Sequence, residues 1–406
     1  LEGRPAMIVA GNDEAGTMYA AYELVERLGV VFQLTNDIIP RQKPDLPLPS
    51  LDVRMEPAFR HRGMHCCHGI RWYMGLADFR REIDQLAKLK MNVLQFYWGM
   101  GGPWAEFSYG GKKAEIIYPR ESGYCAWAWN SGTAKSVLVG RECFAQDYLG
   151  PPEFARAQTQ EDAYRIARDF LREIIRYAHQ RKVRVWLAIG EMTYVPPNLV
   201  PPPAKRLGFG PFYCGIAIPH GDPAMLDIYE AAVGSMIETY PDADRYWVVT
   251  GSEAHIAADD PRSQAMIRPY AHLRGLLPQK PAPATDTDLA DVAAADKLMR
   301  RIKARYPAAR LGAELVFRGG QLRALDAVLP KDVWLMNMVN WDGETAMGYF
   351  AGIQGRELIV WPRITDDGCE LNIQLNAMMY DHEETITGAV RHGVGGILCL
   401  LYTSPS

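Results

Sequence analysis

Two kinds of segment alternate along most of the chain, and this alternation constrains the fold more than any other feature. Short apolar runs of strand length are separated by longer segments whose apolar residues recur at helical spacing. Eight strands are predicted, at residues 59–67, 92–98, 183–189, 245–251, 309–317, 333–341, 356–362 and 393–398. Strands that alternate with helices form parallel sheets, and an open doubly wound sheet usually has only about five or six of them. The pattern therefore predicts an α/β fold of the (β/α)₈ TIM-barrel type.

Amphipathic helices are predicted between most of these strands. They lie at residues 76–90, 161–182, 222–240, 288–306, 320–329 and 371–392, while the sixth connection, 344–355, is short and has the least defined helix. The eighth strand runs directly into CLLYTSPS, which resembles the translation of a transposon-type sequencing adapter. We therefore expect residues 399–406 to be a non-native tail and the closing helix of the barrel to be missing.

A smaller α/β module precedes the barrel. The segment AMIVAGNDEAGTMYAAYELVERLGVVFQ reads as a strand, a turn, a helix and a second strand, with Gly29 placed as a helix C-cap glycine. The chain begins without Met on a run that already leads into a strand, and the Pro-rich PRQKPDLPLPS follows the module. We expect a small, N-terminally truncated α/β domain at residues 1–50 and the barrel at 57–398.

Composition excludes several classes of partner. The net charge of −4 provides no basic surface for nucleic acid or anionic lipid, and no apolar run reaches the roughly 18 residues that span a bilayer. The seven cysteines show neither paired zinc spacings nor a dense disulfide framework. We expect a soluble protein without nucleic-acid or membrane partners. The oligomeric state and the compartment stay open, although a secreted or periplasmic location is favoured if a signal peptide preceded Leu1.

Carboxylates follow several of the predicted strands at the end where barrel enzymes build their active sites. Glu191 follows the third strand, Glu253 the fourth, Asp342 the sixth, and Asp366 and Asp367 the seventh. Carboxylates gathered on one rim repel each other, which lowers stability unless a function uses them. We predict a catalytic pair in which Glu253 acts with Asp367, Asp342 or Asp366.

Aromatic and polar residues near the same rim favour a sugar as the substrate. Trp98, Trp104 and Trp341 could offer flat apolar faces to the C–H faces of pyranose rings. Arg62, His65, Glu191 and His255 would bind hydroxyl or carboxylate groups. The sequence therefore predicts an oligosaccharide or a polysaccharide-derived substrate.

A metal site is the main alternative suggested by a local motif. HCCHG places His65 and His68 three residues apart, but positions i and i+3 of an extended strand point to opposite faces. No nucleophile elbow, P-loop or Rossmann fingerprint is present. We expect no metal and no cofactor.

The order of the two domains resembles glycoside hydrolases in which a domain like the second domain of family 20 hexosaminidases precedes a catalytic barrel. GNDEAGTMYAAYELVERLGVVF resembles the end of that domain, and PAFRHRGMH resembles the start of the first barrel strand. Family 20 enzymes have an Asp before the catalytic Glu, whereas Ser252 stands there in this chain. The resemblance therefore does not imply substrate-assisted chemistry.

The family 67 α-glucuronidases share this domain order, and similarity to them implies a general acid at Glu253 and a base at Asp342, Asp366 or Asp367. The sequence thus predicts a glycoside hydrolase that inverts the anomeric centre. The alternatives are a carbohydrate-binding barrel that has lost catalysis, and a metal-dependent hydrolase.

Overall fold

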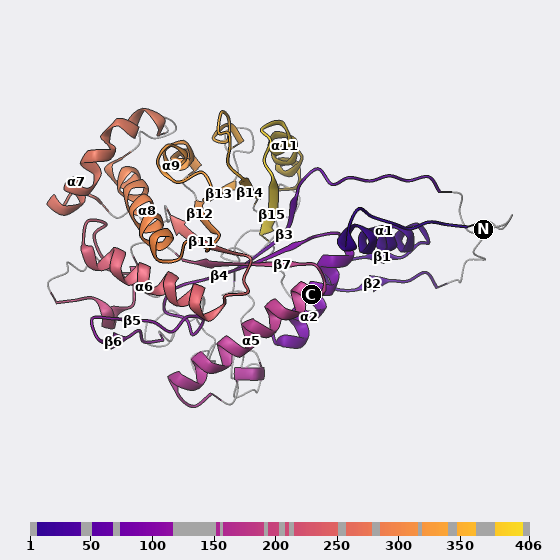
Figure 1. Ribbon diagram of the computed structural model, residues 1–406, viewed down its shortest axis with the longest axis horizontal. Helices are drawn as coiled ribbons and strands as arrows, with labels where there is room; N and C mark the ends of the chain where they lie inside the picture. The colour runs from indigo at the N-terminus through magenta and orange to yellow at the C-terminus, as the bar shows by residue number, and fades with distance from the viewer. Residues whose placement is uncertain are drawn as a thin grey trace.

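The computed structural model describes residues 6–41, 51–67, 74–116, 152–154, 157–190, 194–202, 208–210, 215–250, 257–277, 285–315, 319–339, 347–362 and 378–400. Eight parallel strands close into a barrel in the order β3-β4-β7-β11-β12-β13-β14-β15, and β15 returns to β3 (Figure 1). They are β3 (His61–Cys67), β4 (Val93–Trp98), β7 (Arg184–Ile189), β11 (Arg245–Thr250), β12 (Leu311–Leu315), β13 (Trp334–Val339), β14 (Leu358–Pro362) and β15 (Gly396–Leu400). All eight predicted strands are confirmed.

Successive side chains along each barrel strand point alternately into the barrel and towards the helices, so the core has an inner and an outer layer. Among the described residues, the buried apolar side chains that point into the barrel form a cluster of their own. They are Val93, Tyr97, Trp186, Ala188, Trp247, Val249, Met336, Met338, Ile359, Trp361 and Leu398. Gly312 makes room for one of the large indoles, since a Cβ at this position would lie 2.3 Å from the Trp247 ring. The barrel interior is therefore packed with side chains.

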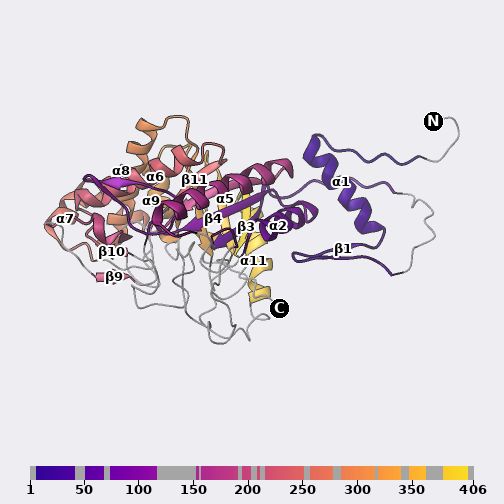
Figure 2. The ribbon, with the colours of Figure 1, turned by 90° about the horizontal axis from the view of Figure 1, so that it is seen from below.

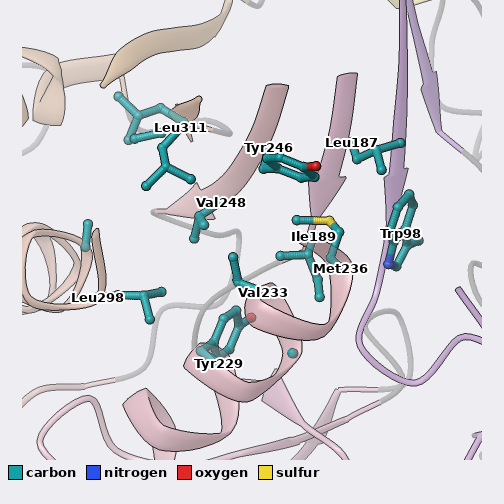
Figure 3. Packing of buried hydrophobic residues seen from close by; sticks show 14 of the residues in the cluster. Trp98, Leu187, Ile189, Tyr229, Val233, Met236, Tyr246, Val248, Leu298 and Leu311 are labelled. Carbon is teal, nitrogen blue, oxygen red and sulfur yellow. The ribbon is translucent and has the colours of Figure 1, made fainter. Parts of the chain in front are cut away.

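The outer layer joins the strands to the surrounding helices. These are α2 (Leu76–Lys88), α5 (Gln160–Gln180), α6 (Pro223–Thr239), α8 (Asp286–Arg305), α9 (Leu322–Val328) and α11 (Met378–Arg391). Figure 3 shows part of this layer, in which Ile189 lies beside Met236 of α6 and Leu187 lies on the side of Trp98. Each of the six predicted helices has a counterpart, although α11 begins at Met378 and residues 371–377 lie outside the described residues.

The fourth connection differs from the prediction. A helix, α7 (Pro261–Ile267), and a 3-10 helix, η4 (Arg268–Leu276), precede α8. Asp260 caps α7 by accepting from the amides of Arg262 and Ser263, and Pro261 occupies the first helical turn, where its missing N–H is not needed. The Asp260-Pro261 pair is a sequence signal for the start of a helix, although no helix was predicted here.

The N-terminal module consists of α1 (Glu14–Arg27) and an antiparallel pair, β1 (Val31–Phe32) with β2 (Asp37–Ile38). Both views place it at one side of the barrel, near α2 (Figures 1 and 2). Asp13 caps α1, and Gly29 has a φ of 96°, as expected of a residue that ends a helix in the left-handed region. The strand predicted at residues 6–10 is not formed, because no described segment pairs with it.

The eighth strand extends past residue 398, its predicted last residue. β15 continues through Cys399 to Leu400, which pairs with His65 of β3. Residues 401–406 lie outside the described residues. Within the described part of the chain, no helix is long and apolar enough to cross a membrane.

Candidate active site at the carboxyl ends of the barrel strands

Most of the predicted site residues lie outside the described residues. This applies to Glu191, Glu253, His255, Trp341, Asp342, Asp366 and Asp367. The strands that lead to them are described and end at Ile189, Thr250, Val339 and Pro362. Because these parallel strands belong to one closed barrel, their carboxyl ends share one rim. The catalytic pair itself stays a prediction.

A polar cluster lies inside the barrel near this rim. Nε2 of His65 on β3 lies 3.0 Å from Oε1 of Glu314 on β12, and Gln95 of β4 donates from Nε2 to Oε2 of Glu314 at 2.7 Å. All three side chains are fully buried. We call His65, Gln95 and Glu314 the polar layer.

Strand geometry explains how residues so distant in sequence meet. Glu314 is the next-to-last residue of β12, and His65 stands two positions before the end of β3. His65 pairs in register with Gln95 on the neighbouring strand, so both side chains point to the same face of the sheet. The polar layer therefore lies inside the barrel, close to the carboxyl ends of the strands.

Aromatic rings surround the polar layer. The ring of Trp361 stacks on His65 with centroids 3.9 Å apart and an interplanar angle of 14°, and the Tyr97 ring lies 5.8 Å from the same imidazole. This stacking fixes the plane of the imidazole. Trp361, predicted only as part of a strand, is thus a close neighbour of His65, a predicted binding residue that points into the barrel.

Several buried polar atoms inside the barrel have no hydrogen-bond partner among the described residues. They are Nδ1 of His65, Oε1 of Gln95, and Nε1 of Trp361 and Trp247. A buried polar atom left unpaired destabilises a protein by about 1–3 kcal/mol, so such a group of atoms is expected where a ligand or ordered water supplies the missing partners.

The tautomer of a neutral His65 depends on which group donates in its hydrogen bond with Glu314. If Glu314 is ionised it only accepts, so Nε2 of His65 carries the hydrogen and Nδ1 of a neutral imidazole offers a lone pair. This arrangement can accept a hydrogen bond from a sugar hydroxyl. Among the described residues, no three His, Cys, Asp or Glu side chains are grouped in a way that could hold a metal ion.

Trp98 and Trp104 do not line the barrel mouth. Both are buried in the outer layer, with ring centroids 6.2 Å apart, and the Trp104 ring contacts Phe154 at 5.9 Å. Trp98 ends β4, but Tyr97 takes the inward position, so the indole of Trp98 points to the helices. Both indoles therefore pack against other side chains in the outer layer. A sugar contact at either residue stays a prediction.

Arg62 is also placed away from the mouth. It points out of β3 and donates from Nε to the Lys90 carbonyl at 2.9 Å and from Nη1 to the Phe59 carbonyl at 2.5 Å. Its guanidinium carbon lies 5.8 Å from the ring centroid of Tyr19 in α1. Arg62 thus joins the barrel to the N-terminal module, and its predicted substrate contact stays a prediction.

Gln95 and Glu314 were not among the site residues predicted from the sequence. Both interrupt otherwise apolar strands at inward positions, and that is a usable signal, because a buried Glu or Gln must find a partner. The partner could not be named in advance, since the pairing of positions 95 and 314 depends on barrel closure.

A surface groove of about 810 Å³ lies elsewhere, between β6 (Lys112–Lys113) and the 3-10 helix η3 (Pro197–Leu199). Its lining includes a single carboxylate, Glu115, and no aromatic ring. These residues offer neither a catalytic pair nor a stacking face, so we do not regard the groove as the active site.

Comparisons with known proteins relate the chain to others through its fold. No protein-family model and no curated protein matches the sequence. Among solved structures, a family 138 enzyme that targets pectin rhamnogalacturonan II matches with a TM-score of 0.50 and 10% identity over 96% of this chain and 38% of the other. Chitobiase from Flavobacterium johnsoniae matches with a TM-score of 0.43 and 11% identity over 85% of this chain and 45% of the other.

A third match is an O-GlcNAc hydrolase of Thermobaculum terrenum, with a TM-score of 0.42 and 12% identity over 85% of this chain and 55% of that protein. The chain therefore spans less than half of the chitobiase and of the family 138 enzyme. It is distantly similar in structure to glycoside hydrolases, and at this level of identity the similarity shows the fold alone.

Proposed function

We propose that the protein is a glycoside hydrolase that cleaves an oligosaccharide or polysaccharide-derived substrate without a metal. The polar layer supports this proposal most directly: a buried carboxylate, imidazole and amide lie near the carboxyl ends of the strands, with Nδ1 of His65 unpaired. Such atoms suit the hydroxyls of a sugar, because each hydroxyl both donates and accepts.

In the proposed mechanism, Glu253 protonates the glycosidic oxygen as the leaving group departs. Asp367, or alternatively Asp342 or Asp366, removes a proton from the attacking water. Glu191, His255 and Trp341, which follow strands of the same rim, would bind the sugar. His65 contributes a hydrogen-bond acceptor whose orientation is held by Glu314 and by the stacked Trp361.

The domain arrangement is part of the proposal. Residues 1–50 would be the small α/β domain and residues 57–398 the catalytic barrel, as in family 20 and family 67 glycoside hydrolases. The fold-level likeness to the family 138 enzyme is compatible with this function. Ser252 in place of the family 20 Asp favours two enzyme carboxylates over a substrate acetamido group.

The first test is the release of reducing sugar from a panel of glycans, with and without a chelator. We expect hydrolysis that the chelator does not change. Hydrolysis that the chelator abolishes would identify the metal-dependent alternative, and sugar binding without any hydrolysis would identify a non-catalytic barrel.

The second test is Glu253→Gln, which preserves the size of the side chain but cannot donate a proton as an acid. Turnover should fall by about 10²-fold or more on natural glycosides and much less on activated aryl glycosides, whose leaving groups need little protonation. Glu161→Gln, on the exposed start of α5, is the matched control and should leave both rates unchanged. Equal losses on both substrate classes would remove Glu253 from the role of acid.

A further inference from the structure

The amino-terminal opening of the barrel, opposite the proposed active site, has an unusual balance of charge. The described residues include every loop that leads into a barrel strand: 57–60, 89–92, 181–183, 240–244, 306–310, 329–333, 351–357 and 392–395. Arg60, His61, Arg184, Arg245 and Glu357 lie there. The charges of Arg60, Arg184 and Glu357 act on His61, and those of Glu357 and Arg184 act on Arg245. Among these five residues, three arginines share one carboxylate.

That carboxylate is already engaged. Arg60 donates from Nη2 to Oε2 of Glu357 at 2.6 Å, and Nε2 of His61 lies 3.2 Å from Oε1. Gly395 allows the approach, because a Cβ at this position would lie 1.8 Å from Oε1 of Glu357. Glu357 is therefore committed to Arg60 and His61.

Arg184 and Arg245 have no carboxylate of their own. Arg245 is only 6% exposed, donates from Nη1 to the Leu311 carbonyl at 2.8 Å, and lies with its guanidinium carbon 3.3 Å above the ring of Trp334. Arg184 donates from Nη2 to the Arg60 carbonyl at 3.4 Å. Throughout the described opening, neither forms an ion pair with Asp or Glu.

The other nearby carboxylates are used outside the barrel. Asp244 accepts from the Val185 amide and from Nε2 of His179, and Asp332 is paired with Lys303. Arg310 adds another positive charge, and burial together with that charge lowers the pKa of Arg245 to about 9. A buried cation without a counter-ion destabilises the fold, and stacking on an indole offsets only part of this loss of stability.

We propose that Arg184 and Arg245 bind a compact oxyanion, such as inorganic phosphate or sulfate, at the amino-terminal opening of the barrel. Guanidinium groups offer several N–H donors in one plane and match the oxygens of a tetrahedral anion. Trp334 holds the guanidinium plane of Arg245, and the N–H groups of Arg245 that do not contact Leu311 have no acceptor among the described residues. The anion would supply the missing countercharge and stabilise the folded barrel from the end opposite the sugar site.

Isothermal titration and thermal melts with sodium phosphate test the proposal, with sodium chloride of equal ionic strength as the reference. We expect saturable phosphate binding to the wild-type protein and a rise in Tm that follows the same saturation curve. Sulfate in a parallel series shows whether the site takes tetrahedral oxyanions in general or phosphate alone.

Arg184→Met and Arg245→Met keep much of the side-chain stem but remove the charge, and each should weaken phosphate binding at least tenfold. Arg165→Met, on the exposed face of α5, is the matched control and should bind phosphate as the wild type does. If Arg245→Met does not fold, phosphate binding by Arg184→Met tests the proposal, because Arg184 is the less buried of the two residues.

Either of two results would contradict the proposed oxyanion site. The first is the absence of saturable binding to the wild-type protein. The second is an equal, unsaturated rise in Tm in the wild type and all variants, since exclusion of the salt from the protein surface acts in this way without a site.

Discussion

His65 and Glu314 lie side by side in the interior of the barrel, with Nε2 of the imidazole 3.0 Å from Oε1 of the carboxylate and both side chains fully buried. Gln95 donates to the other oxygen of Glu314. One carboxylate therefore organises two polar side chains from neighbouring strands, and the layer should be sensitive to its loss.

Glu314→Ala should lower the free energy of unfolding by about 3–5 kcal/mol, because the change leaves His65 and Gln95 buried without their acceptor. Urea denaturation measures this loss. Glu161→Ala, at an exposed position, is the control and should change stability by less than about 0.5 kcal/mol. A loss below about 1 kcal/mol for Glu314→Ala would mean that water or another group replaces the carboxylate.

Asn337→Leu should have the opposite effect. Asn337 is 1% exposed, and neither of its amide atoms has a hydrogen-bond partner in the part of the chain that the structure describes. Replacing it with an apolar side chain of similar size removes the unpaired atoms, so the free energy of unfolding should rise by about 1–3 kcal/mol. Asn92→Leu is the matched control: its amide accepts from the Arg62 amide and donates to the Arg60 carbonyl, so this change should destabilise. Destabilisation by Asn337→Leu would show that the amide is satisfied in solution.

The sequence predicted the barrel far better than the site. Period-2 and helical patterns are local, so β4 and β7 could be located to within a residue. The direction of a single side chain near a strand end is harder to predict, because a shift of one position moves it to the other layer. Trp98 was expected at the mouth for this reason, whereas Tyr97 takes the inward position.

Contacts between strands that are far apart in the chain could not be predicted from the sequence either. The pairing of His65 with Glu314 joins positions 249 residues apart and depends on barrel closure. The unpartnered Arg184 and Arg245 could not be recognised without knowing where every nearby carboxylate lies.

Two histidines should make the stability of the protein depend on pH in opposite directions. Burial is the largest influence on His61 and lowers its pKa, whereas the hydrogen bond to Asp244 is the largest influence on His179 and raises its pKa. Neutral His61 contributes to the free energy of unfolding at pH values above about 6.5, the pKa of His in the unfolded chain. This contribution is lost as pH falls through the pKa of His61 in the folded protein. His179 contributes fully at pH values below about 6.5, and its contribution is lost as pH rises through its pKa in the folded protein.

Thermal melts of His61→Gln and His179→Gln between about pH 4.5 and 8.5 would check these signs. Relative to the wild type, His61→Gln should be most destabilising at the alkaline end of the range and His179→Gln at the acidic end. Parallel curves for the two variants would contradict both assignments.

Lys90 should hold the N-terminal module against the barrel. Its Nζ pairs with Glu23 at 2.8 Å and with Glu26, and its φ of 60° is a left-handed conformation that Asn tolerates. Lys90→Asn should therefore leave the turn intact but increase amide hydrogen exchange in α1. Lys182 is a matched control, since it has the same φ and pairs with Glu14, but that pair is exposed. Lys182→Asn should have little effect. If both changes increase amide hydrogen exchange in α1 equally, contacts other than those of Lys90 hold the N-terminal module against the barrel.

The final prediction concerns the stereochemistry of hydrolysis. Retaining glycosidases place their two carboxyl groups about 5 to 5.5 Å apart, whereas inverting enzymes leave about 6.5 to 9.5 Å so that a water molecule fits between base and sugar. The candidates to act with Glu253 are aspartates, Asp342, Asp366 and Asp367, which are one methylene shorter than the glutamate of many retaining barrels. A shorter side chain withdraws the carboxylate and leaves room for water. We therefore expect proton NMR of the first-formed product to show the anomer opposite to that of the substrate. A product that keeps the substrate's configuration would require a nucleophile close to Glu253 and would exclude an aspartate base.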